Sequence, residues 1–197
     1  NAPYAYVRIV HEPELHEYQY HVIEPVLTEK EKELLETVKT RLIESLDVNL
    51  KSIADESARQ YLKKRINNLL KDYRISLSPK NREKIVYYII RDFVGYGEID
   101  AMMRDSNLED ISCDGPLTPI YVYHKKYNSI ASNIHFEGDE ELDTFAIRIA
   151  QICGRHLSLA NPLLDATMPD GSRIQLTLGR EVTTRGSTCL LYTSPSP

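Results

Sequence analysis

The chain has 197 residues, which is enough for one large domain or two small ones. Its hydrophobic content of 42% and charged content of 27% are typical of a folded globular protein and exclude a disordered one. The net charge of −5 argues against a nucleic-acid-binding protein, and no run reaches the ~18 apolar residues of a membrane span.

Cysteine and histidine do not predict a metal centre. Three cysteines stand far apart without a Cys-x-x-Cys pair, so neither a zinc site nor a disulfide framework is indicated, and a reducing cytoplasm is expected. The N-terminal histidines His11, His16 and His21 recur every five residues, which is not a zinc-binding spacing. Solvated or stacking histidines are the alternative.

Residues 1–27 form an extended segment. Tyrosine and valine are frequent between Ala2 and Glu24, and Pro13 stands between them, which predicts two short strands joined by a turn. The tyrosines either pack within these strands or form a contact surface for a partner. Because the chain begins with Asn1 and not with methionine, we expect it to lack the upstream part of the gene product.

Residues 28–100 are predicted to form a bundle of three amphipathic helices. Thr28 and Glu31 have the spacing of a capping box at the first helix start, and Ser78-Pro79 is a typical start for the third, which ends near Gly95. The second helix carries a basic cluster that has two interpretations. It is either a surface that binds acidic lipid or a partner protein, or it is a solvated helix face. Neighbouring acidic residues favour the solvated face.

Residues 101–188 are predicted to form a small antiparallel sheet with helix cover, which makes the chain an α+β protein. The expected strands are Glu109–Cys113, Pro119–His124 and Ser129–Phe136, and the expected helix opens at Gly138 and closes at Gly154.

The most informative stretch is the hairpin expected over Pro162–Gly179. Pro169-Asp170-Gly171 forms the turn, because proline presets one backbone angle and glycine supplies a positive φ. In the second strand Ile174, Leu176 and Leu178 alternate with polar residues, so Arg173 faces outward. A solvated arginine is the ordinary interpretation of this position.

Several catalytic motifs are absent from the sequence. No glycine is followed by lysine, so the chain has no phosphate-binding loop, and it shows no nucleophile elbow, zinc-protease or dinucleotide motif. Ser112 and Cys113 near His124 suggest a nucleophile and base, but no orienting third group is apparent. Asp165 and Asp170 suggest a pair of carboxylates, but an aspartate in Pro-Asp-Gly is usually a turn-former. No catalytic or metal-binding residue is therefore predicted.

Four stretches resemble the N-terminal region of archaeal type II/type IV secretion-system ATPases, within the secretion and pilus motor ATPase superfamily. They occur in the family's order over residues 20–188: Tyr96–Asp100, LEDISCDGP (Leu108–Pro116), PIYVYHKKY (Pro119–Tyr127) and the long run Cys153–Thr188.

This resemblance implies a PAS-like N-terminal lobe from a homo-hexameric motor. In that family a C-terminal motor lobe, missing here, holds ATP and Mg²⁺, and the N-terminal lobe closes over the nucleotide and lends arginines to its phosphates. Arg173 and Arg185 are then the expected phosphate contacts, with Arg155 and Arg180 as weaker candidates. This chain alone is expected to hold no cofactor and to be inactive.

The resemblance further implies a cytoplasmic protein, peripheral at the inner face of the cell membrane, that binds an integral-membrane assembly platform and no nucleic acid. It would power pilus assembly or protein secretion. Two alternatives stay open, an archaellum motor ATPase and a non-enzymatic adaptor docked on a secretion complex.

The sequence departs from the family pattern after Thr188. An aromatic-Thr-Ile-Arg-Lys-Phe continuation is expected, and the chain instead reads CLLYTSPSP over 189–197, with Tyr192 where an arginine is expected. These residues are typical of translated adapter DNA. They are predicted to be a non-native tail outside the fold.

Overall fold

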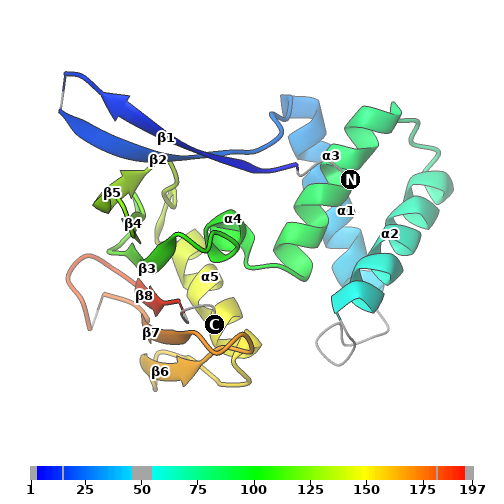
Figure 1. Ribbon diagram of the computed structural model, residues 1–197. Helices are drawn as coiled ribbons and strands as arrows, with labels where there is room; N and C mark the ends of the chain where they lie inside the picture. The colour runs from blue at the N-terminus through cyan, green and yellow to red at the C-terminus, as the bar shows by residue number, and fades with distance from the viewer. Residues whose placement is uncertain (1–3, 15, 46–54, 181, 194–197) are drawn as a thin grey trace. The chain divides into compact units, whose positions relative to one another are not determined.

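The computed structural model describes residues 4–14, 16–45, 55–180 and 182–193 and divides into two compact units (Figure 1). A helical unit contains Glu24–Asp100 with Tyr4 and Ala5, and a sheet unit contains Tyr6–Ile23 and the chain from Ala101 onward. The α+β fold is confirmed.

The helical unit consists of α1 (Glu29–Ser45), α2 (Asp55–Asp72) and α3 (Pro79–Phe93), as predicted. The capping box at α1 is present, since the Thr28 N–H donates to Glu31 at 2.8 Å and the Glu31 N–H donates to the Thr28 hydroxyl at 3.3 Å. Ser78 caps α3 through the Asn81 N–H at 3.2 Å. These local bonds fix the helix starts that the sequence indicated.

An apolar core holds the three helices together. Its buried members come from all three: Leu35, Val38, Leu42, Ile66, Leu70, Ile85 and Ile89. Each such side chain contributes about 1.5–3 kcal/mol when removed from water, which exceeds what helix propensity and caps supply.

One buried cation completes the helical unit. Arg91, 11% exposed, contacts Glu24 at 2.7 Å, Asp92 at 2.7 Å and Glu98 at 3.2 Å. Burial alone would lower the pKa of this guanidinium, but the three carboxylates outweigh burial and raise it. Tyr88 adds its ring face 4.9 Å from the same group.

The sheet unit contains an eight-stranded sheet in the order β1-β2-β5-β4-β3-β8-β7-β6. The strands are β1 (Tyr6–Glu12), β2 (Glu17–Ile23), β3 (Leu108–Cys113), β4 (Tyr121–His124), β5 (Asn128–Ser132), β6 (Leu163–Thr167), β7 (Arg173–Thr177) and β8 (Thr188–Tyr192). Before β3 the chain forms a short helix, η2 (Gly97–Ile99), which belongs to the helical unit, and α4 (Asp100–Met103), which belongs to the sheet unit from Ala101 onward. Helix α5 (Asp139–Ile152) contacts β7 and β8 (Figure 1).

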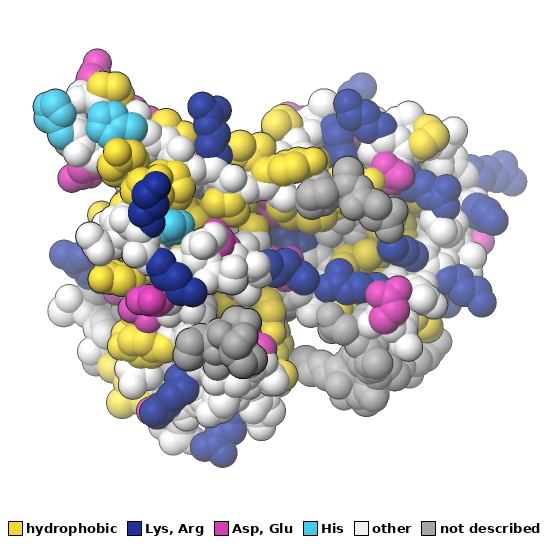
Figure 2. Space-filling model, in the orientation of Figure 1, with side chains coloured by type: hydrophobic (Ala, Val, Ile, Leu, Met, Phe, Trp, Pro, Cys, Tyr) yellow, Lys and Arg dark blue, Asp and Glu magenta, His cyan; other side chains and the backbone are white. Residues whose placement is uncertain are grey.

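The N-terminal strands are confirmed, but they belong to the sheet unit and do not form a separate segment. β2 pairs with β5 in parallel, the exception in an otherwise antiparallel sheet. A short turn can join two antiparallel strands, but parallel strands need a longer connection. More than a hundred residues separate β2 from β5 in the chain. Histidine side chains gather near the turn end of the β1–β2 hairpin (Figure 2), where the centroids of the His11 and Tyr18 rings lie 5.0 Å apart.

The fold continues past Thr188, contrary to expectation. β8 lies in the middle of the sheet, antiparallel to both β3 and β7. Cys189 and Leu191 are buried and alternate with Leu190 and Tyr192, so these residues have the period of two that a strand requires. That they are non-native stays a prediction.

Candidate functional site

The motifs that resemble the secretion ATPases occupy neighbouring strands. LEDISCDGP forms β3 and the turn after it, PIYVYHKKY contains β4, and the Pro162–Gly179 hairpin forms β6 and β7. Since β4, β3, β8, β7 and β6 are consecutive in the sheet, three stretches that are distant in sequence share one surface.

The hairpin has the predicted turn and register. Leu163 pairs with Thr177 and Thr167 with Arg173. In the turn, the Gly171 N–H donates to the Met168 carbonyl at 3.0 Å, and Gly171 has φ +89°, which only glycine adopts at low cost.

Arg173 lies on the sheet face opposite to α5. Its neighbours in the strand, Ile174 and Leu176, are buried, while the Arg173 side chain is 68% exposed. Its guanidinium Nη2 contacts both oxygens of Asp165 on β6, at 3.2 and 3.3 Å. An exposed pair of this kind is worth about 0–1 kcal/mol, so a phosphate group could replace the carboxylate at small cost.

Arg180 follows β7 in the chain, and its side chain contacts the first residue of α5. Its Nη2 contacts Asp139 Oδ2 at 2.7 Å, and Asp139 is followed by Glu140 and Glu141 in the first helical turn. The three carboxylates are stabilised by the positive N-terminal end of the helix dipole, but they repel an anionic ligand at that end.

Arg185 lies in a loop that packs closely on the turn after β3. A Cβ on Gly115 would lie 2.6 Å from the Arg185 carbonyl oxygen, and a Cβ on Gly186 would lie 2.7 Å from Asp139 Oδ1. Ser187 fixes the same loop, because its hydroxyl bonds Asp143 and accepts the Gly179 N–H at 2.8 Å. The backbone at Arg185 is therefore held firmly, while its side chain is exposed.

Arg173 and Arg185 lie at opposite ends of the β7–β8 pair. Arg173 pairs with Tyr192, and Thr177 pairs with Thr188, three residues after Arg185. Arg173 and Thr177 are four strand residues apart, which is about 13 Å. Arg155 is an exposed residue just past the end of α5, with its N–H bonded to the Ala150 carbonyl at 3.0 Å.

The suggested nucleophile and base do not meet. Ser112 pairs with Tyr121, three residues before His124, and its hydroxyl donates to Asp114 at 3.2 Å. Burial raises the pKa of Cys113 to about 11, so its thiol stays protonated near neutral pH. These residues have structural partners and no shared reaction centre.

Tyr96–Asp100 belongs to the helical unit and closes a turn there. Asp100 is 8% exposed and its Oδ1 accepts the Tyr96 N–H at 3.0 Å. A Cβ on Gly95 would lie 2.3 Å from that oxygen, which explains the glycine. The part of this motif that the structure describes therefore has a structural role.

The residues missed from the sequence are the supports of the loop before β8. Asp139, Asp143 and Gly115 come from three segments, and only tertiary contact shows their relation. The sequence signal for these close contacts was the pair Gly115 and Gly186, which precede Pro116 and Ser187. Across the described ranges, no three His, Cys, Asp or Glu side chains group as metal ligands, and no helix is long and apolar enough to cross a membrane.

No known protein-family profile matches this chain. Uncharacterized proteins of the archaeon Methanocaldococcus jannaschii are similar. MJ1288 is 46% identical over 164 residues, 83% of this chain and 65% of the relative. MJ0900 is 33% identical over 159 residues, covering 81% and 28%, and MJ0781 is 27% identical over 146 residues, covering 74% and 19%. This chain thus spans less than two thirds of each relative.

Among solved structures, the VirB11 ATPase from the Brucella suis type IV secretion system, in complex with sulphate, is similar with a TM-score of 0.41 and 16% identity. The match covers 49% of this chain and 28% of that one.

Proposed function

We propose that this chain is the N-terminal region of a hexameric motor ATPase that powers pilus assembly or type II-like protein secretion. The observation that carries the proposal is the convergence of the family-like motifs on β4, β3, β7 and β6, which with β8 are consecutive strands of the sheet, with Arg173 exposed on their open face. Motifs that serve one binding surface are expected to be neighbours in space.

Arg173 is the residue proposed to contact nucleotide. A guanidinium on a strand offers several fixed N–H donors to a phosphate and neutralises charge during phosphoryl transfer. Asp165 holds this side chain in the absence of nucleotide. ATP and Mg²⁺ would bind a C-terminal motor lobe of the full-length protein, and Arg173 would reach the phosphates when the lobes close.

The positions of the arginines divide their proposed roles. Since Arg173 and Arg185 start from opposite ends of β7 and β8, we propose that they contact different phosphate groups or the nucleotides of different subunits. The membrane platform and the cytoplasmic location at the inner membrane face belong to the same proposal.

The complete gene provides the first test. A phosphate-loop motif in frame within about 100 codons downstream supports the motor. A natural stop codon directly after this region contradicts it and supports the adaptor.

Turnover by the full-length protein provides the second test. Arg173→Ala should lower kcat/KM for ATP about tenfold or more, because one charge-assisted contact is worth about 1.5–3 kcal/mol. Arg8→Ala is the matched control, an exposed arginine on β1 outside every motif. Equal kcat/KM in the two variants would refute the phosphate role.

A further inference from the structure

A pocket of 430 Å³ lies between β1, α4 and the end of β4 in the sheet unit. One wall is apolar and consists of Val7, Ile9 and Ala101. The other is polar and consists of Arg104, Asp105, Asn107 and His124. An apolar wall facing a few polar groups is the usual composition of a small-molecule site.

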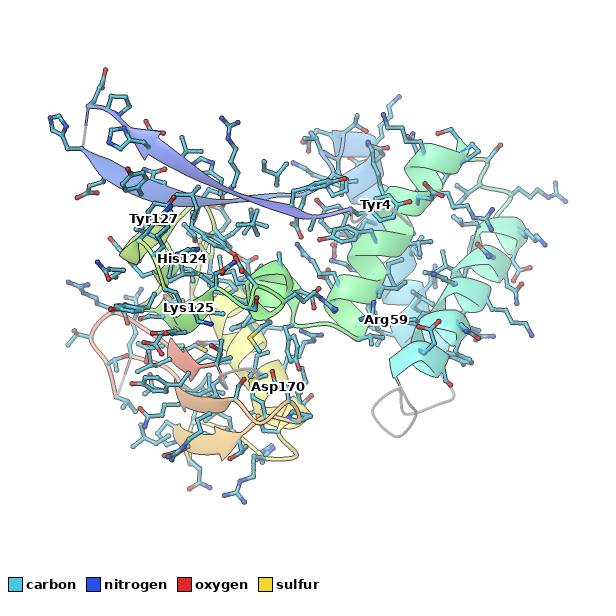
Figure 3. All side chains as sticks on the ribbon, in the orientation of Figure 1. Tyr4, Arg59, His124, Lys125, Tyr127 and Asp170 are labelled. Carbon is cyan, nitrogen blue, oxygen red and sulfur yellow. The ribbon has the colours of Figure 1, made fainter. Side chains whose placement is uncertain are left out.

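His124 presents a fixed donor to this pocket. The side chain is 9% exposed, and its Nδ1 accepts the Lys126 N–H at 3.0 Å (Figure 3). A neutral imidazole with an accepting Nδ1 carries its proton on Nε2. Within the described ranges no group accepts a hydrogen bond from Nε2–H. Nε2–H is therefore a donor that a ligand in the pocket can use.

The orientation of the His124 ring is set before any ligand binds. Its centroid lies 5.0 Å from that of Tyr127, which lies 4.8 Å from Tyr18 (Figure 3 labels His124 and Tyr127). Tyr18 in turn contacts His11 at 5.0 Å. These tilted and edge-on ring contacts reduce the freedom that binding would otherwise remove.

Asp105 limits the charge that the pocket accepts. Its oxygens receive the Tyr20 hydroxyl at 2.9 Å and both the N–H and the side-chain amide of Asn107 at 2.9 Å. These three hydrogen bonds fix the position of the Asp105 carboxyl group in the lining. With Arg104 as the cation in the lining and Asp105 as a fixed anion, a monoanion is favoured over a dianion such as phosphate.

We propose that this pocket binds a small carboxylate with an apolar body. The carboxylate accepts from His124 Nε2–H and the Arg104 guanidinium, and the body packs on Val7, Ile9 and Ala101. The site is independent of the nucleotide role, because β4 lies three strands from β7, and His124 and Arg173 lie on opposite faces of the sheet.

Free acids and peptide C-termini share this chemistry, and four probes separate them. Isocaproate represents the free acid, and N-acetyl-leucine represents a peptide C-terminus. N-acetyl-leucinamide has the same body without charge, and inorganic phosphate has charge without the body. Each is titrated into the ¹⁵N-labelled 197-residue chain while histidine ring nitrogens are observed by NMR.

The expected result has three parts. His124 shows the Nε2-protonated form, and one or both carboxylates shift its Nε2 signal, while the amide and phosphate do not. Arg104→Gln weakens carboxylate binding about tenfold or more, because it removes a charge-assisted hydrogen bond to the carboxylate. Arg8→Gln leaves binding unchanged, because Arg8 stands between Val7 and Ile9 with its side chain on the other face of β1.

Tighter binding of isocaproate assigns a free acid, and tighter binding of N-acetyl-leucine assigns a peptide C-terminus. The proposal is overturned if no probe shifts His124, if phosphate or the amide binds as well as the carboxylates, or if Arg104→Gln and Arg8→Gln bind alike. Arg104 is exposed, so its variant is expected to fold.

Discussion

Gly115→Ala should destabilise the sheet unit because the loop that carries Arg185 leaves no space for a side chain. Gly115 has φ +109°, and an added Cβ would lie 2.6 Å from the Arg185 carbonyl oxygen and 3.2 Å from its Cβ. The obstructing oxygen is backbone, so the loop itself has to move.

The cost has two parts. The positive φ adds about 1–3 kcal/mol for a residue other than glycine, and overpacking adds about 1–3 kcal/mol. We therefore expect a loss of about 4 kcal/mol in the free energy of unfolding. For a chain of this size that lowers Tm by about 8–16 °C.

Gly154→Ala is the matched control. Gly154 also has a positive φ, +67°, but no atom lies within 4 Å of an added Cβ. Only backbone strain applies, at about 1 kcal/mol and about 2–4 °C in Tm.

Urea and thermal unfolding of both variants measure the difference, and amide NMR shifts near residues 180–188 locate it. If Gly115→Ala costs no more than Gly154→Ala, the close packing of the Arg185 loop on this turn is wrong.

Three further outcomes follow from single side chains. Asn133→Ala should lower the free energy of unfolding by about 1–3 kcal/mol and lower the hydrogen-exchange protection of β2. The reason is that the Asn133 side-chain amide bonds both the N–H and the carbonyl of Val22, at 2.7 and 3.0 Å. Unchanged protection of β2 would contradict this role of Asn133. Arg91→Met should cost about 3–5 kcal/mol in urea unfolding, since it removes the cation shared by Glu24, Asp92 and Glu98, and a neutral effect would refute this stabilising role. The pKa of Cys113 is raised to about 11 from 9.0, so the unfolded chain loses this proton first and stability should fall between about pH 9 and 11. Cys113→Ala should show a smaller fall across that window, and equal falls would exclude Cys113 as the cause.

Local features were readable from the sequence. The capping box at Thr28, the Ser78-Pro79 helix start and the Pro169-Asp170-Gly171 turn each depend on residues within a few positions of one another. Short-range hydrogen bonds and φ preferences act within that distance, so the pattern of residue types was sufficient.

Part of the candidate site was also readable, because alternation placed Arg173 on the exposed face of its strand. The separation of Arg173 from Arg185 was not, since it depends on the antiparallel register of β7 and β8.

Long-range pairing was decided only by the tertiary structure. No local signal shows that β2 joins β5 in parallel, that residues 188–192 form a central strand, or that His124 meets Arg104 and β1 in one pocket. Such contacts form between segments whose individual patterns are equally compatible with other partners, and they are selected by burying the most apolar surface together. The sequence alone determined where α1 and α3 of the bundle begin and which residues form the β6–β7 hairpin, because those signals are local. The packed sheet decided which of their side chains share a site.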